Sequence, residues 1–251
     1  MSSAEARIAG AAARTAELSG NLSGLLARIE AACRMAGRAP ESVRLLPVTK
    51  FFPASDVAIL YQLGRREFGE SREQETAAKI EVLRAGDHPG IRWHMIGRLQ
   101  RNKARNVARW AHTVHSVDSE RLVNALAAGA RAALDAGERT EPLRVLLQVS
   151  ADDDPARGGV TAAEIPGLAA KTAAAPELRL SGLMVIPPLD TEADAVFARL
   201  AALRTRLLAD HPEAEEFSAG MSGDLESAIE HGSTVVRVGT ALMGARPIIS
   251  A

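Results

Sequence analysis

The stretch LLPVTK (Leu45–Lys50) is an apolar run that stops at a lysine. Short runs of this kind, rich in apolar or β-branched residues, recur along the chain. Stretches with apolar residues three and four positions apart separate them. This alternation predicts strands that are each followed by a helix. The predicted strands cover residues 44–50, 66–71, 91–97, 112–118, 143–150, 178–187, 215–222 and 234–244.

Eight strands alternating with helices in 251 residues indicate a one-domain α/β fold, a (β/α)8 TIM barrel. A doubly wound open sheet is the alternative, but no G-x-G-x-x-G pattern follows the first strand. Residues 21–40, which precede the first strand, are predicted to form an extra N-terminal helix that packs on the barrel. We therefore expect a flexible lead over residues 1–18 and a single barrel over residues 19–248.

The composition argues against several classes of protein. The 30 basic and 31 acidic residues leave a formal net charge of −1, which is not typical of a general binder of nucleic acid or anionic membranes. Cys33 is the only cysteine, so neither a disulfide framework nor a thiolate metal cluster is expected. The apolar runs are too short for a membrane span or a signal peptide, and we expect a cytoplasmic protein.

The carboxyl ends of the strands are where the functional groups of such barrels collect. Lys50 ends the first strand, and burial there would favour the neutral amine, which forms Schiff bases with aldehydes. A lysine that extends from the rim into water is the alternative. The other notable residues at these ends are Glu70, Ser71, His94, Asp118, Met184, Pro187, Ser222, Arg237, Gly239 and Thr240.

The last two strands indicate a phosphate site. Ser222 lies where a strand turns into a helix, so nearby amides can point at an anion, and a plain helix N-cap is the alternative. Arg237 and Gly239 are two apart and share one face of a strand, with Thr240 next in line. An arginine within such an apolar strand needs a ligand or a carboxylate as its partner.

A lysine on the first strand together with a phosphate site on the last two describes a pocket for pyridoxal 5′-phosphate (PLP). A Schiff-base aldolase that binds a sugar phosphate would explain the same residues equally well.

Seven motifs resemble those of one known family and occur in the same order. They are PVTKF, REFGES, WHMIGRLQRNKAR, HSVDSERL, GLMVIPP, FSAGMSGDLESAI and RVGTALMGAR, and the resemblance as a whole runs from about residue 20 to residue 247. By these motifs the chain resembles the PLP homeostasis proteins. The resemblance implies the barrel of the alanine racemase N-terminal domain, the fold of type III PLP proteins, without the second domain of the racemase.

The resemblance also implies roles for the residues at the strand ends. Lys50 would carry PLP covalently as an imine, and Ser222, Gly239 and Thr240 would bind the phosphate. Arg237 would lie near the pyridine nitrogen. A permanently charged guanidinium keeps that nitrogen unprotonated and weakens the ring as an electron sink, which fits a protein that holds PLP better than a catalyst.

Three further residues complete the predicted cofactor site. Ser71 replaces an asparagine of the family motif and has a shorter reach, and Met184 lies near the end of the sixth strand. His94 either approaches the cofactor or is a hydrogen-bonded core histidine. No catalytic residue and no metal ligand is expected. His112 and His115 have H-x-x-H spacing, but residues three apart on a strand face opposite sides, which predicts a pair at the strand rim.

The sequence therefore predicts a protein that takes part in intracellular PLP homeostasis, passes PLP to apoenzymes as transient partners and has no strong catalytic activity. The alternative is a PLP-dependent amino-acid racemase, which needs an acid or base on each face of its substrate. Alanine racemases take the second, a tyrosine, from a further domain, whereas Tyr61, the only tyrosine here, is predicted away from the barrel mouth. An aldolase is less favoured because its lysine usually lies on a later strand. We expect a monomer or a weak dimer.

Overall fold

The computed structural model describes residues 3–152, 158–188 and 191–245. Within these residues, eight parallel strands form one sheet in the order β1-β8-β7-β6-β5-β4-β3-β2. A parallel bridge between Val48 and Gly69 joins the two edges of this sheet, so the strands form a nearly closed barrel. This confirms the predicted fold. The strands are β1 (Arg44–Pro47), β2 (Glu67–Glu70), β3 (Arg92–Met95), β4 (Ala111–Val117), β5 (Leu143–Val149), β6 (Leu178–Val185), β7 (Glu216–Ser218) and β8 (Val235–Val238).

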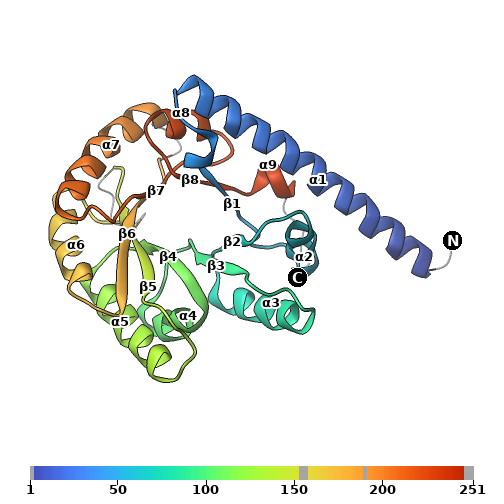
Figure 1. Ribbon diagram of the computed structural model, residues 1–251, viewed down its shortest axis with the longest axis horizontal. Coiled ribbons are helices and arrows are strands. Elements are labelled where there is room, and N and C mark those ends of the chain that lie inside the picture. The colour runs from blue at the N-terminus through green and yellow to red at the C-terminus, as the bar shows by residue number, and fades with distance from the viewer. Residues whose placement is uncertain (1–2, 153–157, 189–190, 246–251) are drawn as a thin grey trace.

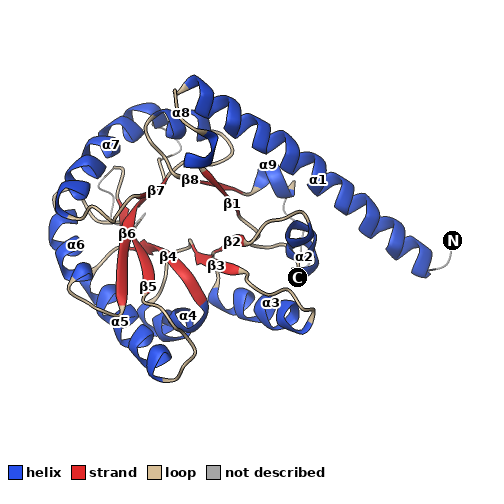
Figure 2. Cartoon of the chain, viewed as in Figure 1, coloured by secondary structure: helices blue, strands red, loops and turns tan. Residues whose placement is uncertain are grey.

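Helices surround the strands on the outside of the barrel (Figures 1 and 2). Alternate residues of each strand point outward and pack against them, as Val236 and Val238 of β8 do in one apolar cluster with Leu22 and Leu25. The helices that follow the strands are α2 (Ala54–Gln62), α3 (Glu73–Ala85), α4 (Ala104–Trp110), α5 (Glu120–Asp135), α6 (Ile165–Ala173), α7 (Ala193–Asp210), α8 (Leu225–Glu230) and α9 (Thr240–Met243). Short 3-10 turns cover Pro40–Ser42 and Arg101–Lys103. None of the helices in the described ranges has both the length and the apolar character needed to cross a bilayer.

The first helix, α1 (Ser3–Met35), lies across α8, α9 and α2 on the outside of the barrel (Figure 1). Its buried stripe includes Leu18, Leu22 and Leu25, spaced by four and three. The helix confirms the predicted extra element but begins earlier, because residues 3–18, expected as a flexible lead, are helical. Their alanine-rich sequence has high helix propensity, and Arg14 donates to Asp56 at 2.6 Å. The division at residue 18 stays a prediction.

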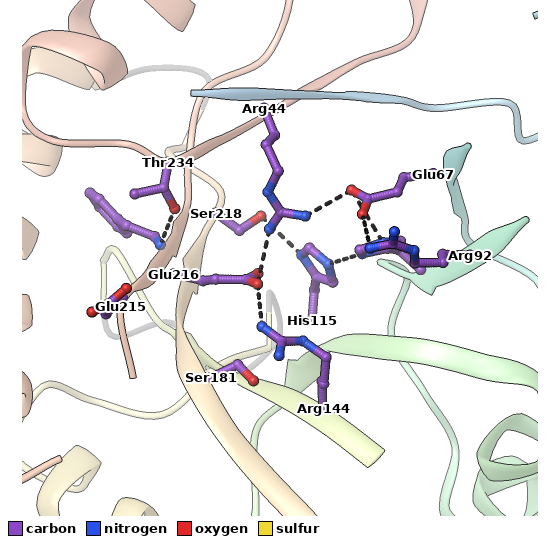
Figure 3. A network of polar contacts seen from close by, with 12 residues as sticks. Arg44, Glu67, Arg92, His115, Arg144, Ser181, Glu215, Glu216, Ser218 and Thr234 are labelled. Atoms are coloured by element: carbon purple, nitrogen blue, oxygen red, sulfur yellow. Dashed lines mark hydrogen bonds and ion pairs between the residues drawn. The ribbon is translucent and has the colours of Figure 1, made fainter. Parts of the chain in front are cut away.

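The amino-terminal end of the barrel interior is filled by ion pairs (Figure 3). Arg44 pairs with Glu67 at 2.8 Å and with Glu216 at 2.9 Å. Arg144 shares Glu216 at 2.5 Å, and Arg92 shares Glu67 at 3.1 Å. Three strands thus contribute cations and two contribute carboxylates, and the opposite charges compensate one another. The polar groups at the carboxyl ends of the strands form a separate set.

Candidate functional site

Lys50 follows β1 on the face of the chain that points into the barrel. Every second residue of this segment points inward, beginning with Arg44, whose side chain pairs with interior carboxylates, and continuing with Leu46 and Val48. A Cβ atom built on Gly69 would lie 3.5 Å from Leu46 Cδ2 and 3.4 Å from Val48 Cγ2, which places both side chains inside. The Thr49 amide still bonds the Gly69 carbonyl at 3.0 Å, so the extended backbone reaches the residue before Lys50. The period of two therefore directs Lys50 into the mouth.

The backbone on both sides of Lys50 is held in place. Lys79 of α3 donates to the Thr49 carbonyl at 2.8 Å and to the Glu70 carboxylate at 2.6 Å. The Thr49 hydroxyl donates to the same carboxylate at 2.7 Å. Phe51, the next residue, has φ +70°, a left-handed conformation that a bulky residue adopts only when its surroundings enforce it. Such enforced backbone is common where a side chain must be held in a functional position.

Glu70 itself does not belong to the mouth. It was one of the candidate residues at the strand ends, but its side chain points outward, to Lys79 on the helix α3. Burial raises the pKa of the Glu70 carboxyl, and the charge of Lys79 partly offsets that effect. The Glu70–Lys79 pair therefore stabilises the backbone at Thr49, next to Lys50, from the outside of the barrel.

Arg237 is a buried cation whose partners are all neutral. Only 4% of the residue is exposed. Its Nη1 donates to the Ser218 carbonyl at 2.7 Å and to the Ser218 hydroxyl at 2.6 Å, and Nη2 donates to the Val185 carbonyl at 2.7 Å. Burial lowers the pKa of Arg237 to about 10, so the guanidinium stays charged at neutral pH. Among the described residues no carboxylate pairs with it, so neutral acceptors alone hold this buried charge.

The predicted phosphate residues lie on two connected segments, one of which passes close to the end of β1. The Ser222 hydroxyl accepts from the Ala241 amide at 3.3 Å, so the loop after β7 is joined to the first turn after β8. Arg28 of α1 donates to the Ser222 carbonyl at 2.8 Å and holds this loop from outside. A Cβ atom on Gly239 would lie 3.6 Å from the backbone of Val48, two residues before Lys50.

The sheet order explains why these groups meet. Strands β1, β8 and β7 are consecutive neighbours in the sheet, and their carboxyl ends carry Lys50, then Gly239 and Thr240, then Ser222. The Arg237 amide donates to the Gly220 carbonyl at 2.9 Å, which extends the pairing of β8 and β7 almost to Ser222. An amine, a guanidinium and a loop of amides and hydroxyls are thus gathered at one part of the mouth.

The remaining predicted site residues lie at different depths along the barrel axis. Ser71 contacts Gly97 at the ends of β2 and β3, since a Cβ atom on Gly97 would lie 2.7 Å from Ser71 Cβ. Met184 is fully buried, in register with Ser218 across β6 and β7. His94 lies deeper: its Nδ1 is 2.9 Å from His115, and its Nε2 is 3.8 Å from a carboxylate at the amino-terminal end. His94 therefore lies between His115 on the mouth side and the ion pairs at the amino-terminal end, and neither ring nitrogen opens onto the mouth.

The expectation for His112 and His115 was wrong. Both rings approach His94, at 5.6 Å and 5.2 Å between centroids. The pairing of β3 with β4 shifts register between Trp93 and His94, which leaves His112 as an extra residue between Ala111 and Thr113, and this irregularity brings two side chains three positions apart to the same side. Among the described residues, no group of three or more potential ligands is arranged to hold a metal ion.

Sequence reasoning missed Ser218, His115 and Lys79. Ser218 had a usable signal, because it lies four residues before Ser222 on the strand that precedes the phosphate loop. His115 drew notice only through its spacing to His112, and the strand irregularity that brings His112 to the same side is not visible in the sequence. Lys79 occupies a position that the apolar stripe of α3 would assign to the buried side, beside Ile80 and three residues after Thr76.

Comparison with known proteins gives consistent results. Residues 21–247 match the family model described as alanine racemase, N-terminal domain. A protein of Mycobacterium tuberculosis named pyridoxal phosphate homeostasis protein is 51% identical over 247 residues, covering 94% of this chain and 96% of that relative. A crystal structure of a protein from Bifidobacterium adolescentis superposes with a TM-score of 0.83 at 33% identity and covers 92% of this chain and 96% of that one. The structure of PipY from Synechococcus elongatus with PLP bound gives a TM-score of 0.74 at 33% identity, with 90% and 100% coverage.

Proposed function

Because this chain belongs to the family of pyridoxal phosphate homeostasis proteins, we propose that it binds PLP at the barrel mouth as an imine with Lys50. The PipY protein, which is similar over its whole length, has been solved with PLP bound. We propose further that this chain takes part in intracellular PLP homeostasis and supplies PLP to apoenzymes through transient contacts. Cytoplasmic location and a monomeric or weakly dimeric state stay predictions.

The observation that carries this proposal is the set of groups on β1, β8 and β7. Lys50 is directed into the mouth, and Ser222 is tied to the turn that begins with Thr240. Between them lies Arg237, a buried guanidinium with only neutral acceptors. PLP offers an aldehyde, a phosphate and a pyridine nitrogen, and these three chemical groups match the three kinds of protein group. The residues present therefore fit the cofactor.

Each residue has a definite task in this proposal. The Lys50 amine, in its neutral form, adds to the aldehyde carbon, a C=N bond forms and the aldehyde oxygen leaves as water. The reaction is reversible and needs no oxidant or reductant, as release to an apoenzyme requires. Arg237 donates a hydrogen bond towards the pyridine nitrogen and, being charged itself, disfavours protonation there. PLP bound in this way is a weak electron sink, which suits storage better than carbanion chemistry.

The position of Tyr61 gives no support to a racemase. Its hydroxyl donates to the Pro89 carbonyl at 3.1 Å, and its ring packs edge-on against His88. These residues belong to the connection between α3 and β3, which enters the barrel at the amino end of the strand, opposite Lys50. A two-base racemase needs a second proton carrier at the mouth. We therefore propose that the protein has no strong catalytic activity of its own.

The experiment that tests the assignment compares wild type with Lys50→Ala after incubation with PLP. The imine absorbs visible light, and borohydride reduction fixes the pyridoxyl group on the lysine that carries it. We expect visible absorption and a single labelled peptide containing Lys50 in wild type, and neither in Lys50→Ala. Lys103→Ala is the matched control, since Lys103 lies on the same end of the barrel but pairs with Glu73 at 3.5 Å, and it should behave as wild type.

Three results would contradict the proposal. Label on another lysine would refute the role of Lys50. Wild-type protein that took up no PLP would favour a Schiff-base aldolase acting on a phosphorylated aldehyde or ketone. Rapid conversion of L- to D-alanine by purified protein would show that the chain is a racemase after all.

A further inference from the structure

A chain of polar contacts descends from Arg237 through the barrel interior. Arg237 Nη1 lies 2.6 Å from Ser218 Oγ, which lies 2.9 Å from His115 Nδ1. His115 Nε2 lies 2.9 Å from His94 Nδ1, and His94 Nε2 lies 3.8 Å from a Glu67 oxygen. Figure 3 shows Ser218, His115 and Glu67 in the middle of the interior network. The chain thus joins the guanidinium at the mouth to the ion pairs at the opposite end.

The hydrogen bonds of this chain run in one direction. Arginine only donates, so Ser218 Oγ accepts from Arg237, and its single proton is left for His115 Nδ1. His115 is then protonated on Nε2 and donates to His94 Nδ1. By the same reasoning His94 carries its proton on Nε2, which faces Glu67. One tautomer of each histidine satisfies the three hydrogen bonds from Arg237 to His94. The reverse direction would leave the Ser218 proton without an acceptor among the described residues and would turn a lone pair of His94 Nε2 towards the Glu67 carboxylate.

The surroundings keep both histidines neutral. His94 and His115 are 1% and 0% exposed. Burial lowers the pKa of both rings well below the usual value of 6.5, and each ring feels further cationic neighbours, Arg237 first among them for His115. Neutral imidazole has one donor and one acceptor, which is the pattern that the chain requires.

These hydrogen bonds fix the Arg237 guanidinium from the side of the barrel interior. Three of its five N–H groups are used, two by Ser218 and one by the Val185 carbonyl. Among the described residues, none accepts from the other two. The bonded side faces the interior, so the plane of the guanidinium is set by Ser218, and the orientation of the Ser218 hydroxyl is set by the acceptor nitrogen of His115.

We propose that Ser218 and His115 are positioning residues for PLP, which hold the unused N–H groups of Arg237 in line with the pyridine nitrogen. This inference rests on the proposed function. Neither residue touches the cofactor. Each acts through Arg237, Ser218 by direct hydrogen bonding and His115 by orienting the hydroxyl of Ser218.

The test uses the full-length protein with three variants and a control. Ser218→Ala removes the hydroxyl that accepts from Arg237 and leaves the two carbonyl acceptors, and His115→Leu removes the acceptor of the Ser218 hydroxyl. His115→Gln keeps one acceptor and one donor on a side chain of similar reach. Thr172→Ala is the control, since Thr172 is also a fully buried hydroxyl but donates to the Leu168 carbonyl within α6, outside the barrel.

Two quantities are measured for each protein: the affinity for PLP, and the 15N chemical shift of PLP labelled at the pyridine nitrogen. For the shift, PLP is first fixed on the protein by borohydride, so every variant is compared at full occupancy. We expect Ser218→Ala and His115→Leu to bind PLP about tenfold more weakly, as the loss of one aligned hydrogen bond predicts. Their 15N signal should move towards that of free pyridine, while His115→Gln and Thr172→Ala should match wild type.

The outcomes separate the two proposals. Failure of wild type to take up PLP would refute the proposed function and this inference with it. Uptake by wild type with unchanged affinity and 15N shift in Ser218→Ala and His115→Leu would refute this inference alone. If affinity and 15N shift changed as much in Thr172→Ala as in the test variants, or as much in His115→Gln as in His115→Leu, the cause would be a general loosening of the fold. Either result would refute the role of oriented hydrogen bonds. If His115→Leu does not fold, Ser218→Ala against Thr172→Ala decides the question.

Discussion

Replacing Lys79 by methionine should destabilise this protein by about 3–5 kcal/mol at pH 7, the usual range for breaking one side of a buried ion pair. Lys79 is 8% exposed and its partner Glu70 is 0% exposed, with 2.6 Å between Nζ and Oε1. Methionine fills a similar volume but leaves the carboxylate with one remaining hydrogen bond, from Thr49, and with Oε2 unpartnered. The uncompensated charge, more than the lost contact, produces the effect.

The size of the effect should depend on the protonation of Glu70. Burial already raises the pKa of this carboxyl above its usual value of 4.5, and removal of the Lys79 ammonium raises it further. Below that raised pKa the carboxyl is neutral and no longer needs a cation. The deficit of Lys79→Met relative to wild type should therefore shrink as the pH falls from 7. The double variant Glu70→Gln with Lys79→Met should recover at least about 2 kcal/mol at pH 7, because no buried charge remains.

Urea denaturation followed by circular dichroism measures these differences. Arg84→Met is the control on the same helix, since Arg84 and Glu81 are 3.6 Å apart with side chains 70% and 76% exposed. We expect it to lower stability by less than about 0.5 kcal/mol. A loss below about 1 kcal/mol for Lys79→Met, or costs of the two single variants that add in the double variant, would refute the argument.

Other predictions concern packing and pH. Gly182→Ala should abolish stable folding, since a Cβ atom there would lie 1.8 Å from the Glu216 carbonyl oxygen. Gly167→Ala should raise the free energy of unfolding by up to about 1 kcal/mol in the same denaturation assay, because open space surrounds this position in α6. Burial keeps the pKa values of His94 and His115 in the folded protein well below 6.5, so below about pH 6.5 the unfolded chain binds more protons than the folded one. The contribution of these histidines to the free energy of unfolding should therefore be largest above about pH 6.5 and should decline as the pH falls. Each histidine adds a slope of about 1.4 kcal/mol per pH unit, so urea midpoints at pH 5, 6 and 7 should vary less in His94→Gln than in wild type, and equal slopes would contradict this reasoning.

The sequence alone determined the barrel and the side on which its chemistry lies. Hydrophobic period and segment length are local properties, and they were sufficient to locate all eight strands. The predicted end of the last strand was wrong, because residues 234–244 include the short helix α9 as well as β8. The strand assignment placed Lys50 at a carboxyl end, and the period of two placed Arg237 and Gly239 on one face of the last strand. Since functional groups of this fold lie at the carboxyl ends, the location of the candidate site followed from the strand assignments.

Only the tertiary structure decided which groups face one another, because that depends on contacts between distant segments. Closure of the sheet brings β1 beside β8, so Lys50 lies next to Gly239 although the two are far apart in the sequence. A register irregularity between β3 and β4 brings His112 to the side of His94, and Lys79 of α3 pairs with Glu70 outside the barrel. Neither contact follows from a repeating pattern, since each depends on a residue of a distant segment, across the sheet or on the covering helix.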